Sequence, residues 1–200
     1  PLRARLTAAG TEHQSFWVAN MLWVRADVGT LAALASDPAV ARIVENAPLR
    51  RDVPRIGHDA PSISGPQIAT GIEWNVAQIG APEVWNMGIT GQGAVVGGMD
   101  TGYQWDHPAL RRQYRGTREG GVRHDFNWHD AIHNDSGICE ANAPEPCDEN
   151  GHGTMTMGIA LGDDGAGNQI GIAPEARWIG CRCWEPIRAT HLSYVTECFE

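Results

Sequence analysis

Apolar residues near the start of the chain fall into short runs that predict two strands and a helix. Residues 16–24 form a run that is long and apolar enough for one buried strand. Residues 30–35 favour a helix, which the Asp-Pro pair that follows would end. Residues 40–45 then predict a second strand. Together the three segments predict a compact strand–helix–strand module.

The pattern is lost between residues 51 and 71, where proline and glycine recur as Pro54, Gly57, Pro61, Gly65 and Pro66. This composition is typical of an irregular, accessible linker, which is where proteases cut chains. We therefore predict a small domain over residues 1–55 and a linker over residues 56–71 that holds a processing site. A second domain would then cover residues 72–200.

Strand and helix patterns alternate through the second domain. The predicted elements are a helix at 82–87, a buried strand at 93–99, a helix at 152–161, a buried strand at 176–183 and a helix from residue 190. Such alternation is typical of an α/β domain in which helices cover both faces of a parallel sheet. Residues 103–150 predict mostly loop, with one short strand at 124–128. A loop of this length in a compact domain is usually functional.

Charge and hydropathy exclude some classes of partner. The formal net charge is −9, which argues against a nucleic acid as the ligand. No apolar run approaches the roughly 18 residues of a membrane span, so we expect no membrane partner. The sequence starts at Pro1, so the lack of a visible signal peptide carries little weight.

The five cysteines indicate an oxidising compartment. Cys139 and Cys147 flank a polar loop, which a disulfide would close in an extracellular protein. Cys181 and Cys183 alternate on a predicted strand, so they point to opposite faces and should not pair with each other. Whether one of them pairs with Cys198 stays open.

Two short sequence motifs contain the candidate catalytic residues. VVGGMDTG places Asp100 at the end of a predicted strand, with Gly102 allowing a tight turn, and NGHGT places His152 at the start of a predicted helix. Either word alone could be an ordinary turn or helix start. An acid and a histidine in this order indicate two thirds of a Ser-His-Asp triad. No serine lies in a convincing nucleophile context; the six are Ser15, Ser36, Ser62, Ser64, Ser136 and Ser193.

Two other chemistries explain less of the sequence. Asp-Thr-Gly also occurs in aspartic proteases, and Asp135-Ser136-Gly137 could be the second half. However, Asp135 follows polar residues rather than an apolar strand. A zinc site could be drawn from His124, His129, His133, Cys139 and Cys147. The residues between these histidines favour loop, and no close Cys-x-x-Cys pair occurs.

The sequence motifs of the second domain, taken together, resemble those of the subtilisin-like serine proteases, or subtilases. The resemblance rests on Asp100-Thr101-Gly102, His107-Pro108-Ala109-Leu110, Asn150-Gly151-His152-Gly153-Thr154 and Gly171-Ile172-Ala173-Pro174-Glu175-Ala176. Within that family, Tyr114-Arg115-Gly116 and Asp125-Phe126-Asn127-Trp128 resemble the bacillopeptidase F type. Residues 1 to about 55 resemble the end of the family's propeptide, an intramolecular chaperone and inhibitor.

The resemblance implies a role for each of the two candidate residues. Asp100 would orient His152, and His152 would act as general base and then as general acid. The family also uses a serine in a Gly-Thr-Ser word and an oxyanion-hole asparagine, and this sequence contains neither. The chain by itself should therefore be inactive.

The sequence departs from the family in two places. Met155, Thr156 and Met157 stand where the family often has His-Val-Ala, which changes the packing behind the base but not the base. Many subtilases bind calcium through an acid after His-Pro, and Ala109 stands there. Calcium could still be a structural ion held by Asp163, Asp164 and Asn168, although the sequence favours a solvated acidic loop.

We interpret the chain as the propeptide end and the N-terminal part of a secreted subtilase-type serine endopeptidase that acts on proteins or peptides. Asp100 and His152 would join a serine beyond residue 200, with no cofactor or metal at the site. We expect the intact enzyme to be a monomer with its own propeptide as a partner. The alternative is a non-catalytic remnant, or an inhibitor or binding module built from a propeptide and half a protease domain.

Overall fold

A computed structural model of the chain describes residues 2–50, 71–135, 137–185 and 189–200. The chain divides into two compact units, Pro1–Leu49 with Thr190–Glu200, and Arg50–Ala189. Residues 56–70 of the predicted linker, with the predicted processing site, lie outside the described residues.

The described residues of the first unit form two short sheets and three helices. Its elements are α1 (Leu2–Ala8), β1 (His13–Phe16), β2 (Met21–Val24), α2 (Val28–Ala35), β3 (Pro48–Arg50), β11 (Ala189–His191) and α6 (Leu192–Glu197). β1 pairs antiparallel with β2, and β3 pairs with β11. Helix α2 confirms the helix predicted at 30–35, and it begins where Asp27 Oδ1 accepts a hydrogen bond from Thr30 N at 2.7 Å.

The two strands predicted in this region are wrong. Residues 16–24 form the turn and second strand of a hairpin rather than one strand, because the chain turns at Asn20, whose φ of 46° is left-handed. Trp17, expected in a buried strand, is 74% exposed at that turn. Residues 40–45 form no strand, and residues 41–45 are exposed. Apolar character alone does not bury a segment that has no neighbour to pack against.

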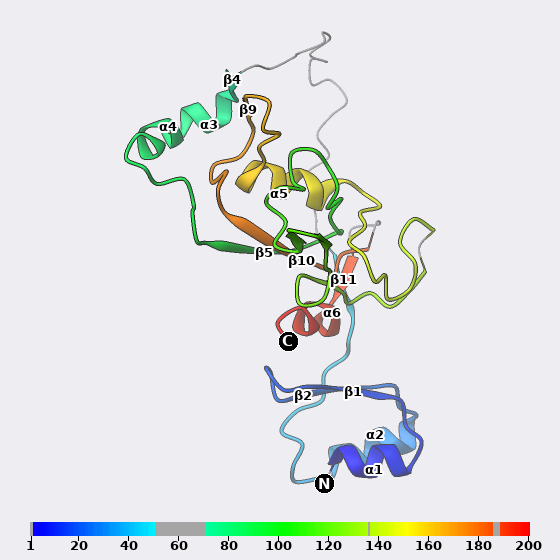
Figure 1. The fold of residues 1–200 in the computed structure, drawn as a ribbon. Helices are drawn as coiled ribbons and strands as arrows, with labels where there is room; N and C mark the ends of the chain where they lie inside the picture. The colour runs from blue at the N-terminus through cyan, green and yellow to red at the C-terminus, as the bar shows by residue number, and fades with distance from the viewer. Residues whose placement is uncertain (1, 51–70, 136, 186–188) are drawn as a thin grey trace, which may run out of the picture. The chain divides into compact units, whose positions relative to one another are not determined.

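The second unit is built on a parallel sheet. Strands β5 (Val95–Asp100), β10 (Arg177–Arg182) and β8 (Trp128–Asp130) lie in the order β5-β10-β8. Helix α5 (His152–Leu161) packs against β5 (Figure 1). The remaining elements are α3 (Trp74–Gln78), α4 (Ala81–Trp85), the pair β4 (Gly71–Ile72) and β9 (Asn168–Gln169), and the hairpin of β6 (Thr117–Arg118) and β7 (Gly121–Val122).

This architecture confirms the parallel α/β sheet, and α4, α5, β10 and α6 fall within two residues of predicted starts. Strand β5 is less buried than predicted. Val95 and Met99 are 46% and 37% exposed, because they lie on the face of β5 turned away from α5. Helices covering that second face remain a prediction. Within the described ranges, no helix has the length and apolar character that crossing a membrane requires.

The core of this unit lies between the sheet and α5. It contains Tyr103, Leu110, Tyr114, Met157, Leu161, Ala176 and Trp178. Glycine in both strands makes room for the Tyr103 ring. A Cβ added at Gly98 would lie 2.2 Å from the Tyr103 hydroxyl oxygen, and one at Gly180 would lie 2.4 Å from the ring. The second glycine of the GG pair in the VVGGMDTG motif is therefore a packing requirement.

The predicted disulfide between Cys139 and Cys147 is present. Cys183 follows β10 as a buried thiol, and burial, with a smaller contribution from Asp100, raises its pKa to about 12.

Candidate active site

The sheet edge and a helix start bring the two predicted residues together. Asp100 ends β5, and its carbonyl oxygen accepts hydrogen bonds from Cys183 N at 3.0 Å and Trp184 N at 3.1 Å. His152 is the first residue of α5. The Nδ1 atom of His152 lies 2.7 Å from Asp100 Oδ1. The His152 side chain is 32% exposed and that of Asp100 is 15% exposed, so the ring is held on one side and accessible on the other.

Two further groups donate to the Asp100 carboxylate. Thr101 N lies 2.7 Å from Oδ1, and Thr156 Oγ1 lies 3.2 Å from Oδ2. The Thr156 hydroxyl has one hydrogen, which it must divide between Asp100 and the carbonyl of Gly153 at 3.0 Å. These bonds fix the orientation of the carboxylate toward the imidazole. Thr156, one of the residues that depart from the family pattern, thus contacts the acid.

Close backbone approach explains one glycine in each of the two motifs. Gly102 has a φ of 122°, and a Cβ there would lie 1.9 Å from the carbonyl oxygen of Cys147. A Cβ at Gly153 would lie 2.0 Å from the carbonyl oxygen of Gly102. The turn after Asp100 and the start of α5 can therefore meet only if both positions lack a side chain.

Sequence reasoning missed Asp148, whose carboxylate accepts hydrogen bonds from both of these segments. Its Oδ1 accepts from Thr101 Oγ1 at 2.8 Å, Gly151 N at 2.9 Å and Asn150 N at 3.1 Å. Its Oδ2 accepts from Thr154 N at 2.9 Å and Thr154 Oγ1 at 2.6 Å. The available signal was an acid shortly before a helix whose N-cap, Gly151, has no side chain.

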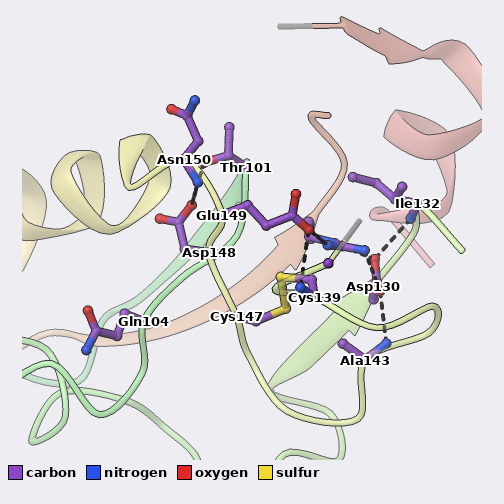
Figure 2. Close-up of a disulfide and its surroundings, with 12 residues drawn as sticks. Thr101, Gln104, Asp130, Ile132, Cys139, Ala143, Cys147, Asp148, Glu149 and Asn150 are labelled. Carbon is purple, nitrogen blue, oxygen red and sulfur yellow. Dashed lines mark hydrogen bonds and ion pairs between the residues drawn. A yellow bond between two sulfur atoms is a disulfide. The ribbon is translucent and has the colours of Figure 1, made fainter. Parts of the chain in front are cut away.

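A disulfide and a buried ion-pair network lie beside the segment that carries Asp148 (Figure 2). Arg182 donates through Nε and Nη2 to the two oxygens of Asp130 at 2.9 and 3.0 Å, and through Nη1 to Glu149 Oε1 at 2.7 Å. All three side chains are at least 95% buried. Glu149 follows Asp148 in the chain, so this network holds the segment that carries Asp148.

Among the described residues, neither alternative site of the sequence is assembled. Cys139 and Cys147 bond to each other, which removes two of the five proposed zinc ligands. Asp135 accepts from Gly137 N at 2.9 Å in a local turn, and Ser136 lies outside the described residues. Across the described ranges, no group of three or more histidine, cysteine, aspartate or glutamate side chains could hold a metal ion.

The loop considered for calcium is held by protein donors. Asp163 forms an ion pair with Arg112 and accepts from Gly165 N at 2.8 Å. Asp164 accepts from Ala166 N at 2.7 Å and from Asn168 N at 3.3 Å. A guanidinium at Asp163 takes the place of the charge that a cation would supply, so these residues do not fit a calcium site.

Comparison with known proteins places this geometry in a family. The Subtilase family (Peptidase_S8) matches residues 91–193, slightly more than half of the chain. The chain therefore belongs to the subtilase family of serine proteases. Over 175 residues it is 33% identical to Bacillopeptidase F of Bacillus subtilis (strain 168), covering 85% of this chain and 12% of that protein.

Other relatives come from different compartments. The major intracellular serine protease of Bacillus subtilis is 36% identical over 98 residues, covering 49% of this chain and 26% of that protein. The minor extracellular protease Vpr is 29% identical over 126 residues, covering 62% and 14%. The structure of an epidermin leader peptide processing serine protease from Staphylococcus aureus matches with a TM-score of 0.63 at 12% identity. It covers 98% of this chain and 43% of that protein, and it supports the fold.

The chain thus spans a minor part of the length of the curated relatives it matches, between 12% and 26%. The bacillopeptidase F-like resemblance is confirmed, and the relatives are proteases.

Proposed function

We propose that this chain supplies the acid and the base of an Asp-His-Ser triad in a serine endopeptidase. The observation that carries the proposal is the 2.7 Å contact between Asp100 Oδ1 and His152 Nδ1 inside the subtilase match. In such a triad the histidine takes the proton of a serine hydroxyl as it attacks the peptide carbonyl, and then gives a proton to the leaving amine. The acid fixes the tautomer and stabilises the imidazolium.

The substrate would be a protein or peptide, and the serine would lie beyond residue 200. Sequencing the encoding locus past Glu200 tests this part directly. A Gly-Thr-Ser word ahead of a helix is expected. A stop codon at that point would instead favour the alternative function, a non-catalytic remnant or an inhibitor-like module.

A second experiment tests the base in the full-length protein. His152→Ala should lower the turnover of a peptide substrate by several orders of magnitude, since the general base is removed. His133→Ala is the matched control, because His133 is an exposed histidine in the loop before the disulfide. Activity of the His152 variant within tenfold of wild type refutes the assignment.

We further propose that residues 1–55 are the end of a propeptide, followed by a processed linker at 56–71 and the catalytic part from residue 72. Hydrogen bonds between the N-terminal segment and residues 190–200 support this. Gln14 Nε2 lies 2.6 Å from Glu197 Oε2, and Asn46 Nδ2 lies 2.9 Å from Ser193 Oγ. N-terminal sequencing of the mature protein should give a start between residues 55 and 71.

The same proposal includes secretion and a monomeric mature enzyme. The Cys139–Cys147 disulfide supports an oxidising compartment. Because extracellular and intracellular proteases are both among the relatives, fractionation of the producing cells is the decisive measurement. Protein in the medium supports secretion, and protein confined to the cytosol contradicts it.

A further inference from the structure

The start of helix α5 lacks its own capping side chain. Its N-cap is Gly151, with a φ of 80° and no side-chain hydrogen bond. The first amides of a helix have no partner within the helix, so an external group must accept from them. Here Thr154 N donates to Asp148 Oδ2 at 2.9 Å, and Gly153 N donates to Thr101 Oγ1 at 3.1 Å. Segments outside the helix therefore cap the turn that carries His152.

The Asp148 carboxylate also connects this turn to the end of β5. Thr101 Oγ1 donates to Asp148 Oδ1 at 2.8 Å while it accepts from Gly153 N. The next bond along the chain, from Thr101 N to Asp100 Oδ1 at 2.7 Å, orients the acid. Asp148 thus bonds directly to Gly151 and Thr154 at the helix start. Through Thr101 it is also connected to Gly153 N, next to His152.

The chemistry of the contacts requires a carboxylate. In the described part of the chain, the groups that reach the Asp148 carboxylate are donors: Thr101 Oγ1, Asn150 N, Gly151 N, Thr154 N and Thr154 Oγ1. A carboxylate only accepts hydrogen bonds, whereas an asparagine amide would turn one NH₂ group toward donors. Negative charge at a helix N-terminus is also favourable because it complements the helix dipole.

We propose that Asp148 is a positioning residue for the Asp100–His152 pair. It holds the first turn of α5 against the turn after β5, so that His152 Nδ1 meets Asp100 Oδ1. Asp148 acts through these segments and does not itself touch the reacting atoms. The inference rests on the proposed function for its effect on turnover, but its effect on the Asp100–His152 contact stands independently.

Asp148→Asn in the full-length protein tests the proposal. We expect kcat for a peptide substrate to fall by about 10²-fold with KM changed much less, since a displacement of about 1 Å can cost that much. Glu145→Gln is the matched control, because Glu145 is an exposed acid in the same disulfide loop. The control should retain wild-type kcat. A wild-type kcat for Asp148→Asn overturns the proposal.

A spectroscopic readout separates positioning from general stability. The proton on His152 Nδ1 should give a low-field NMR resonance because it is hydrogen-bonded to the Asp100 carboxylate. In folded Asp148→Asn protein this resonance should shift upfield or be lost through exchange with water, while Glu145→Gln leaves it unchanged. An unshifted resonance overturns the proposal whatever the activity. Wild-type protein that shows the resonance but cleaves no peptide instead refutes the proposed function alone.

Thr101 supplies a second test if Asp148→Asn does not fold. Thr101→Val removes the hydroxyl that joins Asp148 to Gly153 N, and it should lower kcat and shift the His152 resonance. Thr101→Ser keeps the hydroxyl and should restore both. Where all variants fold, the combined Asp148→Asn and Thr101→Val changes should lower kcat by less than the product of their separate effects. If Thr101→Val and Thr101→Ser give the same kcat and the same His152 resonance, Thr101 does not connect Asp148 to the start of α5.

Discussion

Asp100 and His152 are separated by 52 positions in the sequence, yet Asp100 Oδ1 and His152 Nδ1 lie 2.7 Å apart. In the full-length protein, Asp100→Asn should lower kcat by about 10⁴-fold, because an amide would stabilise the wrong imidazole tautomer. Steady-state kinetics on a peptide substrate measure the effect. Circular dichroism that matches wild type must accompany it, and a kcat within tenfold of wild type contradicts the proposed role.

The contact between Gly102 and the carbonyl of Cys147 predicts an intolerant position. Gly102→Ala places a Cβ 1.9 Å from that oxygen, so the turn after Asp100 must move and the loss of unfolding free energy should exceed about 4 kcal/mol. Gly120→Ala is the matched control, because Gly120 also has a positive φ but no atom lies near its added Cβ. Backbone strain alone should cost about 1–3 kcal/mol there. Equal losses in urea unfolding would show that no clash occurs.

Arg182 is expected to be essential for stability. Arg182→Met leaves the buried carboxylates of Asp130 and Glu149 without their cation, which should lower the free energy of unfolding by about 3–5 kcal/mol. Arg118→Met, at an exposed arginine in the β6–β7 hairpin, should change it by less than about 0.5 kcal/mol. Denaturant unfolding of both variants gives the comparison. Similar stability of the two variants would mean that the network contributes little.

The disulfide should stabilise the segment that ends at Asp148. Replacing Cys139 and Cys147 together with serine should lower the free energy of unfolding by about 2–3 kcal/mol, because a short closed loop is released in the unfolded chain. Hydrogen exchange should show faster exchange of the Gly151 and Thr154 amides, which donate to Asp148. Unchanged exchange at these amides would show that Asp148 is held without the disulfide.

Burial of Cys183 predicts a loss of stability in alkali. Its pKa is raised from 9.0 to about 12, so above pH 9 the unfolded chain releases a proton that the folded chain retains. Stability should therefore fall as the pH rises from about 9 toward 12, and Cys183→Ser should reduce this slope. Buried Tyr103 and Tyr114 also have raised pKa values and add a slope above pH 10, so the comparison belongs between pH 8.5 and 10. If wild type and Cys183→Ser lose stability equally with rising pH, the loss does not come from the Cys183 thiol.

The sequence by itself determined the two motifs around Asp100 and His152, because key positions in them tolerate no other residue. Asp100 and His152 were predicted because steric and chemical constraints are local: glycine is needed beside each of them, and the flanking strand and helix patterns are strong. The same holds for the Cys139–Cys147 disulfide, whose cysteines flank one short loop. Local patterns also gave α5 and the parallel sheet, although they could not show that Val95 and Met99 lie on an exposed face.

Tertiary structure alone decided which distant groups meet. Asp148 resembles any polar loop residue in the sequence, because its role depends on Thr101, which lies 47 positions away. Arg182 was hidden in an apolar strand pattern, since its partners Asp130 and Glu149 come from strand β8 and from the segment before α5. The prediction of a single strand over residues 16–24 was wrong for the same reason. Hydrophobic pattern reports what a segment can bury, but burial and hydrogen bonding depend on partners that only the folded chain supplies.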